Sequence, residues 1–392
     1  MIILEQVRLA LDILTKNGYF AYVVGGCVRD SLLFYTSDNY ILQDKAARPP
    51  KDWDVTTSAL PEQILDCFHD YRVIETGLKY GTITVIIDKL PIEITTYRID
   101  GDYTDNRHPS GVSFTDNLKD DLSRRDFTMN AIAYNIEVID YFGGTDDIRN
   151  KIIRTVGDPD KRFSEDALRI LRGIRFAAQL NFKIEENTKN SIIKNKDLIK
   201  NISDERINAE LTKLILGKNF YNALSEYKEV IPFSYELSET LKNSEEDLIL
   251  RLSILLWDTE NPRSVLKGLK FDNYTIDNVI KITENKNTKI IMEKQELKKL
   301  LNKLSEPILR YLLKIKNQSE AILDEIIENG ECYLLKDLKI DGNDIRDSGI
   351  TAGKKIGEIL NEVLMLVIEE KLENNKEACS NYIKNEYNDY ML

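Results

Sequence analysis

Hydrophobic and polar positions change their spacing near residue 150. Before that point, β-rich runs at residues 21–24, 82–87 and 92–97 alternate with glycine and proline, after a helical pattern over about residues 3–17. The segment 88–91 between two of these runs predicts a hairpin turn and an antiparallel pair. Beyond residue 160, a helical spacing of Leu, Ile, Lys and Glu continues to the end of the chain. The pattern predicts an α+β fold in which a mixed α/β head is followed by all-helical segments.

Length and composition indicate an ordinary globular protein. The 392 residues, 42% of them hydrophobic, exceed the size of one core and predict roughly two to four domains. No run of about eighteen apolar residues is present, and the first residues lack the pattern of a secretion signal, so we expect a cytoplasmic protein with no membrane partner. The four cysteines are scattered without metal-type spacing, which predicts reduced thiols.

The net charge of −12 argues at first against a nucleic-acid partner. The charge is unevenly distributed, however. Residues 151–220 contain fifteen Lys and Arg against ten Asp and Glu, a balance of +5, so a local basic face for nucleic acid stays open.

Asp52 and Asp54 stand one residue apart in a run that predicts a strand. Side chains at i and i+2 of a strand leave the same face, so both carboxylates point one way while Trp53 and Val55 turn toward the core. Because Mg²⁺ is usually held by one or two carboxylates plus substrate phosphates, the pair is interpreted as a catalytic nucleotide-metal site. An Asp-x-Asp pair is also common at strand ends, and the neighbouring motifs favour the metal interpretation.

Gly25 and Gly26 follow an apolar strand and precede a predicted helix start around Arg29. Without a Cβ at these positions, backbone amides can approach a triphosphate. Arg29 and Arg125 would then neutralise the phosphates opposite the metal as pyrophosphate forms. The alternative is a simple strand-to-helix turn with a surface arginine.

Asp126 follows Arg125 directly. Its carboxylate is a candidate acceptor for a ribose 2′-hydroxyl, the group that separates ribonucleotides from deoxyribonucleotides. The preceding Arg124 is interpreted as structural.

The segment 162–175 has charged residues three apart. This spacing predicts one slanting row on a helix, made by Asp166, Arg169, Arg172 and Arg175. The row is either a solvated salt-bridge ladder or a base reader. Cytosine and adenine both offer an amino donor beside a ring-nitrogen acceptor, which an Asp acceptor next to an Arg donor would match. The pair Asp166 and Arg169 would then admit CTP and ATP and reject GTP and UTP.

Six ordered motifs together resemble those of the class II tRNA nucleotidyltransferases and their poly(A) polymerase relatives, within the polymerase-β-like superfamily. The motifs are Gly25-Gly26-x-x-Arg29-Asp30; Asp52-x-Asp54; Arg124-Arg125-Asp126-Phe127-Thr128-x-Asn130-Ala131; Phe142-Gly143-Gly144 with Ile152-Ile153-Arg154-Thr155-Val156-Gly157; Glu165-Asp166-x-x-Arg169; and Glu205-Arg206-Ile207.

The resemblance implies a fold and an activity. It implies a head, neck, body and tail, expected at residues 1–145, 146–215, 216–330 and 331–392, with the last three helical. It also implies Mg²⁺-dependent addition of C, C and A from CTP and ATP to the 3′ end of tRNA without a nucleic-acid template. The roles it implies are phosphate contact for Gly26 and Arg29, metal binding for Asp52 and Asp54, a place in the nucleotide site for Arg125, base reading for Asp166 and Arg169, and further nucleotide contacts for Arg172 and Arg175.

The expected reaction is attack of the tRNA 3′-hydroxyl on the α-phosphate, with Asp52 or Asp54 taking the proton. The helical half would grip the tRNA through phosphates and shape. Glu93 is a candidate third carboxylate, although an edge-strand glutamate explains it equally well. One departure from the family pattern is an extra polar segment at about 34–47, interpreted as a surface insertion. The oligomeric state, monomer or homodimer, stays open.

Several activities share the same head motifs. Poly(A) polymerases, CC-only enzymes and A-only enzymes are the alternatives. The segments 338–345, 353–357 and 374–377 resemble the tail of CCA-adding enzymes from Gram-positive-type bacteria. Residues 100–120 resemble a flexible loop that CC-only enzymes lack. A non-catalytic RNA-binding protein would be expected to lose the metal carboxylates, which are both present.

Overall fold

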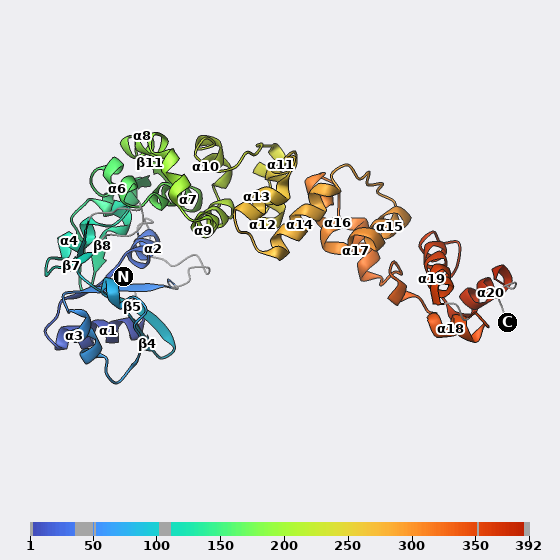
Figure 1. Cartoon of the computed structure of the whole chain (residues 1–392), viewed down its shortest axis with the longest axis horizontal. Helices are drawn as coiled ribbons and strands as arrows, with labels where there is room; N and C mark the ends of the chain where they lie inside the picture. Colours follow the sequence, from blue (N-terminus) through green and yellow to red (C-terminus); the bar gives the residue numbers. More distant parts are fainter. Residues whose placement is uncertain (1–2, 36–49, 51, 102–110, 351–352, 388–392) are drawn as a thin grey trace. The chain divides into compact units, whose positions relative to one another are not determined.

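The structure is a computed structural model that describes residues 3–35, 50, 52–101, 111–350 and 353–387. The chain divides into two compact units, one of residues 1–234 and 268–270 and the other of residues 235–267 and 271–392. A mixed sheet forms the N-terminal part of the first unit, and helices dominate the rest (Figure 1). The predicted α+β class, a mixed head followed by helical segments, is confirmed.

A seven-stranded sheet forms the centre of the head, in the order β3-β4-β5-β2-β1-β8-β9. Strands β2 and β5 pair in parallel, and the other neighbours pair antiparallel. The predicted hairpin is confirmed between β4 and β5, where Asp88 and Lys89 adopt φ values of 47° and 69°. Such left-handed values are typical of a two-residue hairpin turn. The strands are β1 Ala21–Val24, β2 Trp53–Thr57, β3 Arg72–Ile74, β4 Thr82–Ile87, β5 Leu90–Thr96, β8 Ile132–Tyr134 and β9 Val138–Asp140.

Helices α1 (Glu5–Lys16) and α3 (Pro61–Cys67) pack against each other and against the sheet. The sheet residues alternate in burial, as period-two strands with one covered face should. In β2, Trp53 and Val55 are both 1% exposed, which confirms the predicted inward direction. Asp54 and Thr56 alternate with them and therefore leave the opposite face of β2.

The remaining elements of the first unit connect the sheet to a helical layer. A ribbon of β6 and β7 follows β5, and β10 pairs with β11 in parallel. Residues 36–47 of the predicted insertion and 102–110 of the predicted loop lie outside the described residues. The elements are α2 Gly26–Tyr35, η1 Leu78–Tyr80, β6 Arg98–Asp100, β7 Val112–Phe114, α4 Leu118–Ser123, η2 Thr128–Asn130, α5 Gly144–Asn150, β10 Ile152–Ile153, α6 Pro159–Glu165, α7 Leu168–Leu180, β11 Lys183–Ile184, α8 Glu186–Lys194, η3 Lys196–Asn201, α9 Asp204–Ile215 and α10 Phe220–Glu226.

The second unit is helical throughout its described residues. Buried side chains between Cys332 and Tyr387 form a core cluster of their own. No helix among the described residues is long and apolar enough to cross a membrane. The elements are α11 Glu239–Lys242, α12 Leu248–Leu255, α13 Pro262–Gly268, α14 Asn273–Glu284, α15 Lys294–Leu304, α16 Glu306–Ile315, α17 Ala321–Glu328, η4 Leu335–Asp337, α18 Gly342–Asp347, α19 Gly353–Ile368 and α20 Lys376–Glu386.

Candidate active site

Three carboxylates at the start of β2 and on the neighbouring strand β5 influence one another through their charges. Asp52 immediately precedes the strand, Asp54 is its second residue, and Glu93 of β5 stands opposite Asp54 in the register. Burial raises the pKa of Asp54, Arg125 partly offsets this, and the charge of Asp52 adds to the rise. Burial and the charges of both aspartates raise the pKa of Glu93. The ionised carboxylates of Asp52, Asp54 and Glu93 therefore repel one another.

This concentration of charge fits a divalent cation, because hard cations take carboxylate oxygens and relieve such repulsion. No group of three or more histidine, cysteine or acidic side chains in the described parts of the chain forms a complete metal site. Glu93 is thus coupled to the aspartate pair through charge without completing a three-carboxylate cluster.

The glycine turn brings Arg125 against Asp54. Gly25 has a φ of 81°, a left-handed value that favours glycine. A Cβ at this position would lie 3.1 Å from Nη1 of Arg125 and 3.5 Å from Oδ2 of Asp54. Gly26 begins the ten-residue helix α2, so the N-terminus of this helix follows directly on the turn that lies beside the Asp54 carboxylate. The turn, the metal-type carboxylate and the arginine predicted from separate motifs meet here.

Arg29 of α2 is held by two neighbours. Its Nε and Nη2 donate to Oδ1 of Asp30 at 2.8 Å and 2.7 Å, and its Nη1 donates to Oδ1 of Asn130 at 2.8 Å. The side chain is 8% exposed. A guanidinium fixed in this way is preorganised for a phosphate, since little rotamer freedom is left to lose.

Asp126 is buried and holds Arg172. Its Oδ2 accepts from Nε and Nη2 of Arg172 at 2.8 Å and 2.6 Å, and its Oδ1 accepts from Asn130 and the backbone N–H of Phe127. Although burial alone would raise it, Arg172 and Asn130 hold the pKa of Asp126 well below its usual range. These four donors match the four lone-pair positions of a carboxylate. A ribose hydroxyl would have to displace one of them, and ribose reading by Asp126 stays a prediction.

Arg175 completes a group of three arginines around Phe176. Its Nε lies 2.7 Å from Oε2 of the buried Glu210 of α9. Burial lowers the pKa of Arg175 to about 10, against the ion pair with Glu210, which raises it. Arg29, Arg172 and Arg175 all lie over the ring of Phe176. Three of the predicted nucleotide-binding arginines are therefore brought together.

The predicted helical row is wrong at its first residue. Asp166 lies between α6, which ends at Glu165, and α7, which begins at Leu168, and its backbone is extended. Oδ1 of Asp166 accepts from the backbone N–H of Leu168, and Arg206 of α9 donates to both carboxylate oxygens at 3.2 Å and 3.0 Å. Aspartate is favoured just before a helix, because its side chain can accept from the N–H groups of the first turn, which have no partner within the helix. Asp166 does this with Leu168, the first residue of α7.

Arg169 is on α7 as predicted, but its partner is Glu165. Nη1 donates to Oε2 of Glu165 at 2.8 Å, and Nη2 donates to the backbone carbonyl of Arg124 at 2.9 Å. Glu165 also forms an ion pair with Arg162 at 2.8 Å. The structure thus gives Asp166 and Arg169 separate partners, and base reading by the two together stays a prediction.

Asp121 links β2 to β6, and the sequence motifs did not indicate this role. Its side chain is fully buried on α4 and accepts from Thr56 of β2 at 2.9 Å and from Nε of Arg124 at 3.0 Å. It also accepts from the backbone N–H of Arg98 in β6, and Nη2 of Arg125 lies 3.9 Å away. Asp121 therefore ties the strand of the carboxylates to the β6–β7 ribbon. The sequence signal was an acid four residues before Arg125, a spacing that a single helical turn brings together.

Family models match three stretches of the chain. A "Poly A polymerase head domain" model matches residues 21–154, and a "Probable RNA and SrmB- binding site of polymerase A" model matches residues 181–230. A model for tRNA nucleotidyltransferase domain 2 matches residues 240–383. The first match contains the glycine turn, both aspartates and Arg125.

Curated and solved relatives extend the match over the full length. A CCA-adding enzyme of Staphylococcus epidermidis is 36% identical over 407 residues, covering 97% of this chain and 98% of the relative. The chain belongs to the family of CCA-adding enzymes. A crystal structure of the Bacillus stearothermophilus CCA-adding enzyme in complex with CTP has a TM-score of 0.78, 28% identity and 98% coverage of each chain. A tRNA nucleotidyltransferase complexed with a primer tRNA and an incoming ATP analogue has a TM-score of 0.63 and 25% identity, covering 81% of this chain and 98% of its own.

Membership of the CCA-adding family makes the chain a tRNA nucleotidyltransferase, and it confirms the resemblance carried by the six motifs. It does not assign roles to individual side chains. The catalytic and binding roles of the residues described above are therefore proposals for this member of the family.

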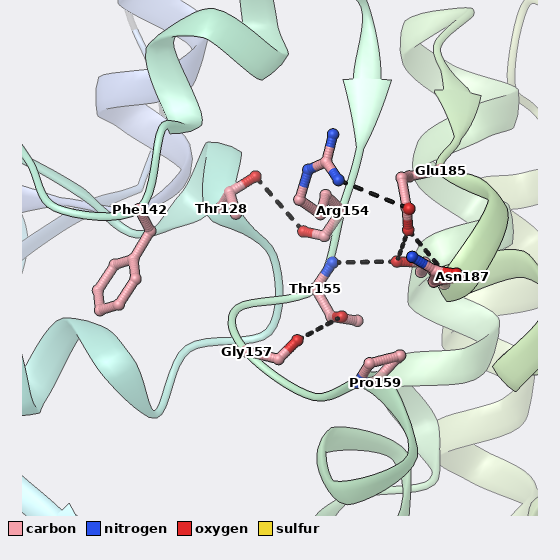
Figure 2. A pocket seen from close by; sticks show the side chains of 9 residues that line it. Thr128, Phe142, Arg154, Thr155, Gly157, Pro159, Glu185 and Asn187 are labelled. Atoms are coloured by element: carbon pink, nitrogen blue, oxygen red, sulfur yellow. Dashed lines mark hydrogen bonds and ion pairs between the residues drawn. The ribbon is translucent and has the colours of Figure 1, made fainter.

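A further pocket lies beside the segment that contains Arg154 and Thr155. Its volume is about 200 Å³, and Figure 2 shows its polar groups paired with one another. Arg154 forms an ion pair with Glu185, and the backbone N–H of Thr155 donates to Thr188. The motif around Arg154 thus joins the head to α8. The lining residues are Thr128, Phe142, Arg154, Thr155, Gly157, Pro159, Glu185, Asn187 and Thr188.

Proposed function

We propose that this chain adds C, C and A to the 3′ end of tRNA from CTP and ATP without a nucleic-acid template. The observation that carries the proposal is the meeting of Asp54, Gly25 and Arg125 at the start of β2, in a chain that matches CCA-adding enzymes over its full length. Complexes of relatives with CTP, and with a primer tRNA and an ATP analogue, support the same substrates.

Asp52 and Asp54 are proposed to hold Mg²⁺, with Glu93 as an added charge nearby. The fit is supported by the raised pKa values of Asp54 and Glu93, which reflect burial first and the neighbouring carboxylate charges second. When bound, the cation would lower the pKa of the attacking hydroxyl and offset charge on the phosphates.

The side chains carry the remaining steps. The RNA 3′-hydroxyl forms a bond to the α-phosphorus while the bond from that phosphorus to the bridging oxygen breaks, and pyrophosphate leaves. Asp52 or Asp54 accepts the hydroxyl proton. Arg125, beside Asp54, and Arg29, on the neighbouring helix, donate to the phosphate oxygens as negative charge develops on the leaving group.

Arg172 and Arg175 are proposed to add nucleotide contacts, and Asp166 and Arg169 to read the base. The ion pair between Asp166 and Arg206 supports this role because it fixes the acceptor without filling it. A carboxylate has about four lone-pair positions, and Asp166 accepts from Leu168 N and from Arg206 Nη2. Arg169 uses three of its five N–H donors on Arg162, Glu165 and Arg124, which leaves two that could face a base.

Replacing Asp166 tests the base reader. Asp166→Ala is expected to lower CTP and ATP use and weaken discrimination against UTP and GTP by about 1.5–3 kcal/mol, because the charged acceptor is gone. Incorporation rates for each labelled nucleotide measure it. Arg206→Gln is the matched control, since it breaks the same ion pair and keeps the carboxylate. Wild-type selectivity in Asp166→Ala would contradict base reading and would mean that Asp166 only stabilises the start of α7.

The helical remainder is proposed to grip the tRNA through its phosphates and A-form shape. We retain the division into head 1–145, neck 146–215, body 216–330 and tail 331–392. The separate core cluster between Cys332 and Tyr387 supports the last boundary. Cytoplasmic location and the choice between monomer and homodimer stay predictions.

A single assay tests the proposed function. Purified protein is incubated with Mg²⁺ and tRNA ending before CCA, before CA or before A, with each labelled nucleotide in turn. Completion of CCA on the first substrate is expected. Products that stop after CC, single additions confined to the last substrate, or long A tails would indicate the CC-only, A-only or poly(A) alternatives.

Shortening the segment between Asp102 and Ser113 tests the loop predicted from the sequence. Strand β6, which ends just before this segment, is joined to the site through Asp121 and Arg124, and β7 pairs with β6, so we expect the segment to influence the pocket. We expect the shortened enzyme to add both C residues and stop before A, since one pocket must change to take a larger base. Product length on a gel measures this, and normal completion of CCA would contradict it.

A further inference from the structure

Phe176 lies at the centre of three guanidinium groups. The Cζ atoms of Arg175, Arg29 and Arg172 are 3.8 Å, 4.9 Å and 5.5 Å from the centroid of its ring. The ring is 3% exposed. A buried phenylalanine usually packs against apolar side chains, so three cations around one ring require an explanation.

The ring offsets part of the repulsion among the three arginines. An aromatic face carries partial negative charge and attracts a guanidinium, more strongly where water is excluded. Carboxylates hold the same three groups from other sides: Asp30 contacts Arg29, Asp126 contacts Arg172, and Glu210 contacts Arg175. Each arginine is thus fixed between a carboxylate and the ring.

The ring itself is held in place by Phe127. The two rings meet edge to face, with centroids 5.8 Å apart and an interplanar angle of 86°. Phe127 is fully buried, and a Cβ on Gly173 would approach its Cζ to 3.2 Å, so little space is left for it to move. Phe127 also donates its backbone N–H to Asp126, the partner of Arg172. The aromatic pair and the ion pair therefore form one rigid assembly.

We propose that Phe176 is a positioning residue that holds Arg29, Arg172 and Arg175 as a preformed site for the triphosphate group of the incoming nucleotide. This inference rests on the proposed function, in which these arginines contact the nucleotide. The aromatic ring of Phe176, and not its apolar volume alone, sets the affinity of the three arginines for the triphosphate.

The test compares Phe176→Leu with Phe163→Leu. Phe163 of α6 is 0% exposed, against 3% for Phe176, and it takes no part in the contacts of Arg29, Arg172 and Arg175 with the Phe176 ring. Both changes remove similar volume. In Phe176→Leu, the KM for CTP and ATP is expected to rise about 5- to 30-fold, the range that one or two lost cation–π contacts give, with kcat and the KM for tRNA nearly unchanged. Phe163→Leu should lower the melting temperature without raising the nucleotide KM.

Two further measurements separate this inference from the proposed function. Binding of inorganic tripolyphosphate by calorimetry needs no turnover, and Phe176→Leu should weaken it by the same factor. Phe176→Tyr keeps the ring and should restore near-normal affinity, while Phe176→Met serves as the ring-free variant if Phe176→Leu does not fold. Equal tripolyphosphate affinity in wild type and ring-free variants, or an equal KM change in Phe163→Leu, would overturn the role of Phe176. Absence of nucleotide addition by the wild-type enzyme would instead contradict the proposed function.

Discussion

Replacing Asp54 with alanine is expected to abolish nucleotide addition, by roughly a thousandfold or more, and to leave tRNA binding nearly intact. Asp54 lies beside Arg125 and opposite Glu93 in the register of β2 and β5. Its loss removes the group that holds the cation and takes part in proton transfer, whereas RNA contacts are proposed for the helical segments. Single-turnover incorporation of labelled CTP and a tRNA gel-shift measure the two properties separately. Asp52→Ala should behave in the same way.

Stability provides an independent measurement on the same variant. Burial and Asp52 raise the pKa of Asp54, so the ionised carboxylate is unfavourable in the protein without metal. Asp54→Ala should therefore keep or raise the melting temperature in the absence of Mg²⁺. Asp70→Ala, which removes an exposed carboxylate of the same head, is the control and should change neither activity nor stability. Normal turnover in Asp54→Ala would contradict the proposal that Asp54 holds the catalytic cation.

Local patterns predicted the head well because its strands are defined by neighbours in sequence. The run from Thr82 to Ile87 alternates in burial, and the turn at Asp88 and Lys89 follows directly, so one short stretch contains the whole hairpin. The direction of Asp54 followed from the burial of Trp53 and Val55 on either side. These features depend on period-two alternation alone.

The error at Asp166 has an equally local cause. Spacings of three are shared by a continuous helix and by two helices that meet at a capping residue, so they could not reveal the break between α6 and α7. An aspartate two residues before an apolar helical run was the available signal, since its side chain can bond a free N–H.

The partners of the site residues could not be read from spacing. Thr56 and Asp121 are 65 positions apart, and Arg172 and Asp126 are 46 apart. Such pairs depend on how the chain folds back on itself. The sequence indicated which side chains carry charge, and the structure alone showed which carboxylate holds each arginine.

Breaking the pair of Asp126 and Arg172 is expected to have the second largest effect. Asp126→Asn should lower the free energy of unfolding at pH 7 by about 3–5 kcal/mol, because it removes the carboxylate that Arg172 contacts directly and leaves only that of Glu210, 4.0 Å away. The nucleotide KM should rise as well, since Arg172 belongs to the arginine group around Phe176. Thermal unfolding and steady-state kinetics measure the two effects.

The pH dependence of this loss follows from the direction of the pKa shift. Arg172 and Asn130 hold the pKa of Asp126 below its ordinary value, against burial, which would raise it. The ionised carboxylate therefore stabilises the folded enzyme above the ordinary pKa, and this stability is lost as the pH falls through the lowered folded value. The difference in melting temperature between wild type and Asp126→Asn should accordingly be full near neutrality and shrink as the pH falls below about 4. A difference that did not depend on pH would show that packing, and not charge, is what Asp126 contributes.

Arg172→Lys separates anchoring from ribose reading. It weakens the same ion pair from the other side, because lysine cannot form the two-pronged contact that Nε and Nη2 make, and it leaves the carboxylate in place. Both variants should lose stability and nucleotide affinity. Only Asp126→Asn should lower the preference for CTP over dCTP if the carboxylate also accepts from the ribose 2′-hydroxyl. If the preference for CTP over dCTP is the same in both variants, Asp126 acts through Arg172 alone. The four donors that already occupy its carboxylate favour this outcome.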